Sequence, residues 1–256
     1  MTDFMTTPDG TRLAYVDSGG PGRPILALHG AFGCGRGWMP LAERLDRRII
    51  APDQRGHGES DKPGDYSRAA FLADTAAFIE KLGLGPVAII GHSLGAINAY
   101  QLAAQRPDLV ESFVAIDFPA EAGDFTNSWL DELPRRFASL GQMHATIRRL
   151  ASIGEPFHFL ESAVQDADGW YFRWNAEDIH ASKRGVIGNW WDDWTGSTCP
   201  ALLLRGGDSP VIPPEHAREM VRRRPNTELV TIAGAGHDMY ISHLDETAAH
   251  IGRFLS

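Results

Sequence analysis

The sequence Gly-His-Ser-Leu-Gly occupies residues 91–95, directly after the apolar run Val87–Ile90. The apolar run predicts a buried strand, and the alanine-rich stretch 94–105, which stops before Pro107, predicts a helix. A serine between glycines in a strand-turn-helix setting is typical of a nucleophile, because the glycines leave room for a sharp turn that exposes the hydroxyl. We therefore expect Ser93 to be a nucleophile.

The rest of the chain repeats this alternation of short aliphatic runs and longer helical patterns, which is typical of a parallel sheet covered by helices. The fold class predicted is α/β, with a mostly parallel, doubly wound sheet. An edge strand is expected at the amino-terminal Arg12–Val16. The other predicted strands are Ile25–Leu28, Ile49–Ala51, Val87–Ile90, Phe113–Ile116, Ala201–Leu204 and Leu229–Ile232, and the predicted helices are Tyr66–Leu82, Leu94–Gln105 and Ser242–Leu255.

Strand patterns disappear between residues 119 and 198, where six of the seven tryptophans occur. A loop of this length without secondary structure is rare inside a compact domain. We expect a helical cap at 119–198, inserted into a core domain formed by 1–118 and 199–256.

A serine hydroxyl needs a histidine base and a carboxylate that orients the histidine. His237 lies in GAGHDM, after the last predicted strand, and Asp208 lies in RGGDSP, after the strand Ala201–Leu204. Both would reach the carboxyl edge of the sheet, where catalytic groups of open α/β sheets collect. The prediction is Ser93, Asp208 and His237, but Asp117 in VAIDFP also ends a predicted strand and could reach the same histidine.

Two backbone amides are candidates for an oxyanion hole. The Leu94 N–H lies at a helix amino terminus, which favours negative charge. The glycine-rich stretch HGAFGCGRGW, which begins at His29, allows the Ala31 N–H to face the same pocket. A phosphate-binding loop is disfavoured, because no Gly-Lys-Ser/Thr follows the glycines.

In these motifs the chain resembles the α/β-hydrolase fold superfamily: HGAF at 29–32, DQRGHGES at 53–60, GHSLG at 91–95, GGDSP at 206–210 and GAGH at 234–237. The resemblance implies Ser93 as nucleophile, Asp208 as acid, His237 as base, and Ala31 and Leu94 as oxyanion donors. It also implies a structural role for the turn at 53–60.

Composition restricts the possible partners. A formal net charge of -9 argues against nucleic acid and anionic membranes, and the two cysteines imply no disulfide framework. The amino terminus has neither a basic nor an apolar leader segment, so we expect a soluble cytoplasmic protein, as a monomer or homodimer. No cofactor and no metal site is predicted, and His29, His57 and His92 are expected to be packing residues.

The predicted function is hydrolysis of a small, apolar carboxylic ester, lactone or thioester through an acyl-enzyme. Substrate contacts are expected from Phe32, Trp129, Trp170 and Trp190. Three alternatives remain open on this fold: a carbon–carbon bond hydrolase, a small-molecule receptor, and a cofactor-free dioxygenase. The resemblance implies that the dioxygenase branch has its acid at the position of Asp117.

Overall fold

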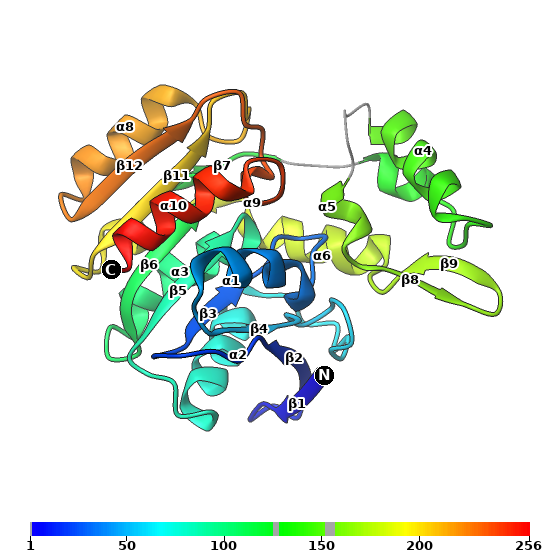
Figure 1. Cartoon of the computed structure of the whole chain (residues 1–256), viewed down its shortest axis with the longest axis horizontal. Coiled ribbons are helices and arrows are strands. Elements are labelled where there is room, and N and C mark those ends of the chain that lie inside the picture. The colour runs from blue at the N-terminus through cyan, green and yellow to red at the C-terminus, as the bar shows by residue number, and fades with distance from the viewer. Residues whose placement is uncertain (1, 125–127, 152–156) are drawn as a thin grey trace.

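A computed structural model describes residues 2–124, 128–151 and 157–256. Within these ranges, one eight-stranded sheet has the order β1-β2-β4-β3-β5-β6-β11-β12 (Figure 1). Strand β2 is antiparallel to its neighbours β1 and β4, and all other neighbouring pairs are parallel. The strands are β1 Thr2–Thr6, β2 Arg12–Asp17, β3 Ile25–Leu28, β4 Ile49–Pro52, β5 Val87–His92, β6 Val110–Ile116, β11 Ala201–Gly206 and β12 Thr227–Ile232.

Helices cover both faces of this sheet, so its inner strands β3, β4, β5, β6 and β11 are buried on both sides. Alternate residues of β3 show the two layers: Ile25 packs into one core cluster and Leu26 into the other. The cluster around Ile25 includes residues of α1 Met39–Leu45, α9 Met239–Ser242, α10 Leu244–Phe254 and the 3₁₀ helix η1 Gly35–Trp38. The cluster around Leu26 includes residues of α2 Arg68–Lys81, α3 Leu94–Gln105 and α8 Pro214–Arg223. Among the described residues, no helix combines the length and hydrophobicity that a bilayer span requires.

The predicted fold class is confirmed, and β3 and α3 have the predicted bounds. The prediction that Arg12–Val16 forms the edge of the sheet was wrong, because β1 pairs with it in antiparallel fashion on the outer side. Strand β1 was not predicted from the sequence, because only Met5 of its five residues is buried. An exposed edge strand carries little of the apolar pattern by which strands are recognised.

The segment 119–198 is called the cap segment below, and its described residues between 128 and 172 lie to one side of the sheet (Figure 1). Its residues 125–127 and 152–156 lie outside the described residues. The expected helices are present, but so is a hairpin of β8 Ala163–Asp166 and β9 Gly169–Phe172, which was not predicted. The other elements are β7 Glu121–Ala122, η2 Ser128–Glu132, α4 Leu140–Ala151, α5 Phe157–Leu160, α6 Ala176–Val186, β10 Gly188–Asn189 and α7 Trp191–Thr195.

The hairpin turns at Gly169, which has a φ of 115°. A side chain there would also meet Phe137 O at 2.6 Å, because Phe137 and Trp170 exchange backbone hydrogen bonds. The hairpin was not predicted because each strand has only four residues, too few for a clear alternating pattern. The polar turn sequence Gln-Asp-Ala-Asp-Gly also overlaps the ends of both strands.

The start of α3 crosses the sheet at contact distance. A Cβ on Gly95 would lie 2.0 Å from Leu28 O, and a Cβ on Gly91 would lie 2.2 Å from Gly95 O. Since Leu28 O and Gly95 O are backbone atoms, they cannot move away by a simple side-chain rotation. The two glycines of the GHSLG motif therefore permit the helix to start directly above β3 and β5.

We expect Gly95→Ala to lower the free energy of unfolding by about 1–3 kcal/mol, because overpacking forces backbone shifts. Chemical denaturation of the purified variant measures this loss. Gly123→Ala is the matched control: a Cβ on Gly123 meets nothing within 4 Å, so its stability should stay within about 0.5 kcal/mol of the parent. Equal stability of the two variants would contradict the packing argument.

Candidate active site

Ser93 lies at the turn between β5 and α3 with φ 52° and ψ -112°. A positive φ is rare for a residue with a side chain, and such strain collects at functional sites. The backbone holds the strained residue in place: the Ser93 N–H donates to Ile116 O over 2.9 Å, and Ser93 O accepts from the Ala96 N–H over 2.9 Å. The partly exposed serine thus lies beside Ile116, the last residue of β6, and Ile116 directly precedes Asp117 in the chain.

His237 follows β12 and forms a short contact with a carboxylate: its Nδ1 lies 2.7 Å from Asp117 Oδ2. The Asp117 side chain is fully buried, and the His237 side chain is 27% exposed. His237 also reaches the serine turn, because its ring lies 4.5 Å from that of His92, the residue before Ser93. The ends of β5, β6 and β12 therefore bring Ser93, Asp117 and His237 to one edge of the sheet.

The predicted pairing of His237 with Asp208 is not the one that the structure has. Asp208 is exposed, and the loop that carries it instead supplies two donors to Asp117. The Ser209 hydroxyl donates to Asp117 Oδ2, and the Gly206 N–H lies 3.3 Å from Asp117 Oδ1. Since β6 and β11 are neighbours, the GGDSP motif supplies hydrogen-bond donors to Asp117, and its own aspartate does not contact His237.

The environment of His237 favours its protonated form. Burial alone would lower the pKa of the imidazole, but the hydrogen bond with Asp117 and the negative charges of Asp238 and Asp117 outweigh burial, so the pKa lies above its usual 6.5. A carboxylate on Nδ1 also fixes the tautomer that leaves Nε2 free to accept a proton. This arrangement suits a general base that becomes charged during the reaction.

The two amides predicted as oxyanion donors belong to chain segments that meet at Ser93. Leu94 is the first residue of α3, and the loop of Ala31 passes close by: a Cβ on Gly30 would lie 3.3 Å from Ser93 Cβ. Among the hydrogen bonds of the described residues, neither the Leu94 N–H nor the Ala31 N–H is a donor. His57 fixes the loop from behind, since its Nε2 lies 2.8 Å from Ala31 O.

The buried histidines His92 and His158 and the partly exposed Asp238 surround the backbone and ring of His237. His92 Nε2 is 3.1 Å from His237 O and 3.6 Å from Asp238 Oδ1, and His158 Nδ1 is 3.6 Å from the same Asp238 oxygen. Burial, followed by the charges of the neighbouring histidines, holds the pKa of His92 well below its usual value. His92 is therefore neutral, in keeping with the packing role expected for it.

Ligand atoms of His92, His237 and Asp238 lie within 4.8 Å of one another, close enough to consider a metal. Two of these groups already have partners within the protein: His237 Nδ1 contacts Asp117, and His92 Nε2 contacts His237 O. These hydrogen bonds account for the cluster, and we assign it no ion.

Sequence analysis did not single out Glu161 or Tyr240, although both extend this buried group. The Tyr240 hydroxyl donates to Glu161 Oε2 over 3.2 Å, and burial raises the pKa of Glu161 to about 8. Glu161 is close to Gly37, where a Cβ would lie 2.5 Å from its Oε2. Cys34 donates to Glu161 O over 3.4 Å, and burial raises the pKa of this thiol to about 12, which keeps it protonated.

Aromatic side chains of the cap segment pack around Phe32, in the loop that follows β3. Phe32 lies at the centre of this aromatic cluster, with ring centroids at 4.6 Å from Phe159, 5.4 Å from Trp174 and 6.1 Å from Trp129. Hydrogen bonds attach the cluster to the loop: Trp174 Nε1 donates to Ser162 Oγ over 2.6 Å, and Ser162 Oγ donates to Phe32 O over 3.0 Å.

Of the predicted substrate contacts, Phe32 and Trp129 lie in this cluster, whereas Trp170 and Trp190 have other positions. Trp170 packs beside Phe137 in a second cluster of the cap segment. Trp190 packs against the main core, with Nε1 donating to Val186 O over 2.8 Å. Both tryptophans thus have packing partners away from Phe32.

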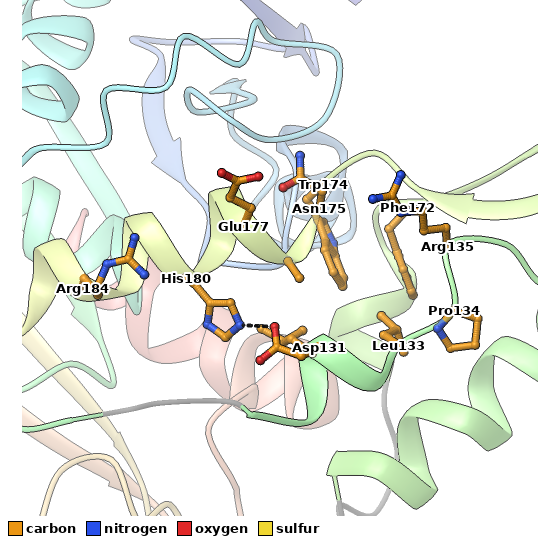
Figure 2. A pocket seen from close by; sticks show the side chains of 12 residues that line it. Asp131, Leu133, Pro134, Arg135, Phe172, Trp174, Asn175, Glu177, His180 and Arg184 are labelled. Atoms are coloured by element: carbon orange, nitrogen blue, oxygen red, sulfur yellow. Dashed lines mark hydrogen bonds and ion pairs between the residues drawn. The ribbon is translucent and has the colours of Figure 1, made fainter.

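A pocket of about 760 Å³ opens on the cap segment beyond the aromatic cluster (Figure 2). Trp174 belongs to both the pocket wall and the Phe32 cluster. The rest of the wall is a mixture of apolar and polar side chains, and His180 faces Asp131 across it with Nε2 3.1 Å from Oδ1. Ser93, Asp117 and His237 do not line this pocket.

Comparison with known proteins identifies the family. The family model for the alpha/beta hydrolase fold matches residues 23–244. The chain is 33% identical over 229 residues to 2-(acetamidomethylene)succinate hydrolase of Mesorhizobium japonicum, covering 85% of this chain and 82% of that protein. It is 27% identical over 241 residues to esterase YbfF of Escherichia coli, covering 91% of this chain and 93% of that one.

A solved structure agrees over the whole chain. The crystal structure of an E-2-(acetamidomethylene)succinate hydrolase superposes with a TM-score of 0.86 at 27% identity, covering 100% of this chain and 98% of the other. The family match covers six of the eight strands of the sheet, from before β3 to the start of α10. The chain belongs to the α/β-hydrolase fold family.

Proposed function

We propose that the chain is a serine hydrolase that cleaves a small carboxylic ester, with Ser93, His237 and Asp117 as its catalytic triad. The contact of 2.7 Å between His237 Nδ1 and the buried Asp117 carboxylate, beside the strained Ser93, carries this proposal. The chain resembles an enzyme named as an esterase along nearly its full length, which supports action on ester bonds.

In the proposed reaction, Ser93 Oγ attacks the ester carbonyl while His237 Nε2 takes the hydroxyl proton. The oxyanion that forms accepts hydrogen bonds from the Ala31 and Leu94 amides. Collapse of the intermediate transfers the proton from His237 to the leaving alcohol and leaves the acyl group on Ser93. Water then attacks the acyl-enzyme, His237 takes its proton, and the acid leaves as Ser93 recovers its hydrogen.

The aromatic cluster supports a substrate with an apolar part. Phe32 directly follows Ala31, so a group bound in the oxyanion hole would lie next to the rings of Phe32 and Trp129. Aromatic walls with few polar groups are typical of small-molecule sites. Trp170 and Trp190 are not part of this proposed pocket.

Cofactor-free dioxygenation is the second candidate, since Asp117 stands where the resemblance gives that branch its acid. Hydrolysis is favoured because the two relatives above are named as a hydrolase and an esterase. Oxygen uptake on a hydroxyquinolone-type substrate, without ester hydrolysis, would reverse this choice. Carbon–carbon bond cleavage and a receptor role lack a supporting contact of their own in the described residues.

Ser93 is expected to carry the covalent intermediate. A fluorophosphonate probe should label the protein, and Ser93→Ala should abolish labelling and lower kcat by about 10⁶. Mass spectrometry of the labelled peptide measures the first effect and ester turnover the second. Labelling that persists in Ser93→Ala would contradict the proposed nucleophile.

Asp117→Asn is expected to lower kcat by about 10⁴, because the amide no longer holds the imidazole in the productive tautomer. Asp208→Asn is the matched control: its carboxylate is exposed and lies in the adjacent loop, so kcat should stay within about tenfold of the parent. Steady-state kinetics on one activated ester, with circular dichroism to verify folding, compares the two. A greater loss in Asp208→Asn would contradict the Asp117 assignment.

The pH dependence of kcat/KM should reflect the protonation of His237. A base acts when it is neutral, so kcat/KM is expected to be lost as the pH falls through the pKa of His237, with a midpoint above 6.5. In Asp117→Asn the hydrogen-bonded charge is absent, so the midpoint of the residual activity should move to lower pH. A midpoint that is unchanged between the two proteins would contradict the pairing.

A further inference from the structure

Lys183 lies on the inner face of α6, one helical turn after Ile179. Ile179 is fully buried in the cluster around Phe32, and the Lys183 ammonium lies 5.7 Å from the Phe32 ring centroid. Phe32 in turn follows the proposed oxyanion donor Ala31. The lysine therefore extends from the cap segment towards the loop that lies beside Ser93.

The ammonium is also within electrostatic reach of the proposed base. The positive charge of Lys183 is among the influences that lower the pKa of His237. Burial lowers the pKa of Lys183 itself to about 8, against an opposing influence from Asp124. The side chain thus remains mostly protonated at neutral pH, in surroundings that disfavour its charge.

Lys183 lacks a direct anionic partner among the described residues. No hydrogen bond or ion pair to Lys183 Nζ is present among these residues. The ammonium instead lies over the ring of Phe32. Arg184, the next residue, is exposed and faces the pocket of Figure 2 instead. A half-buried cation that forms no hydrogen bond or ion pair among the described residues, placed against the loop of Ala31 and Phe32, is suited to an anion that arrives with the substrate.

We propose that Lys183 binds a carboxylate of the substrate, so that the ester carries one negative charge in addition to its apolar part. This inference rests on the proposed function, because it assigns a substrate class to the same site. A charge-assisted hydrogen bond would form between Nζ and a carboxylate oxygen, replacing water on both groups. Lys183 is then a residue that determines specificity, and the triad performs the chemistry without it.

Two pairs of esters test the proposal, each matching a carboxylate against a neutral acetyl group of similar shape. Monomethyl succinate and methyl levulinate differ in the acyl part, while 4-acetoxybenzoate and 4-acetylphenyl acetate differ in the alcohol part. The parent protein is expected to prefer the anion in at least one pair. Lys183→Met should lower kcat/KM for that anion by about 10- to 100-fold and change the neutral ester by less than about threefold. Lys183→Arg, which keeps the charge, should retain part of the preference.

Arg184→Met is the matched control, since it removes one positive charge from the same helix on the side that faces away from Phe32. It should leave both kcat/KM values within about twofold of the parent. An equal loss of the anion preference in Arg184→Met, or equal losses for anionic and neutral esters in Lys183→Met, would overturn the role of Lys183. The absence of an anion preference in both pairs would overturn it as well.

A binding measurement separates failure of this inference from failure of the proposed function. In Ser93→Ala, which cannot form the acyl-enzyme, the anion of at least one pair should raise the Tm more than its neutral partner. Adding Lys183→Met should remove the difference. If the parent hydrolyses none of the esters, the proposed function fails, and this Tm difference still decides whether Lys183 binds a carboxylate. An equal Tm shift with and without Lys183 would overturn the inference even in an active esterase.

Discussion

The contact between the first turn of α3 and the end of β3 is the constraint on which the proposed site depends. Gly95 approaches Leu28 O so closely that any side chain would overlap it, and Gly91 approaches Gly95 O in the same way. The chain between these glycines has to turn sharply, which gives Ser93 its positive φ. The same contact brings the Leu94 amide, at the start of the helix, beside the loop that contains Ala31. One backbone crossing therefore sets the positions of the candidate nucleophile and of both candidate oxyanion donors.

The buried carboxylate that faces His237 is stabilised by hydrogen bonds from residues near the ends of neighbouring strands. Asp117 continues β6, and its oxygens receive hydrogen bonds from Ser209 and Gly206 at the end of β11 as well as the contact with His237 after β12. A fully buried carboxylate is costly unless it is paired and hydrogen-bonded. These donors satisfy that requirement. The exposed Asp208, by contrast, would have to leave water to take the same position.

Most of the core could be predicted from the sequence, because parallel strands covered on both faces are nearly continuous apolar runs. Strand β1 and the hairpin β8–β9 could not, since their side chains are largely exposed or the strands are very short. The edge of the sheet that carries the candidate site was also predictable, because it is formed by the carboxyl ends of the strands that the apolar runs predict. The choice between Asp117 and Asp208 was not, because both follow strands that end at this edge. Only the packing of β6 between β5 and β11 shows which carboxylate is buried against His237.

The route by which the chain leaves the sheet has a consequence for motion near the site. Asp117 is two residues before Pro119, where the cap segment begins, so the carboxylate that faces His237 lies close to the point where the cap segment leaves the sheet. That point is anchored: Tyr100 Oη donates to Pro119 O over 3.3 Å, the Trp190 N–H donates to Ala120 O over 2.8 Å, and the Ala120 N–H donates to His216 Nε2 over 3.1 Å. Just beyond, β7 and β10 join the outgoing and returning chains. A movement of the cap segment would thus bend the chain beyond these hydrogen bonds. Asp117 and His237 would then keep their alignment while small molecules enter and leave.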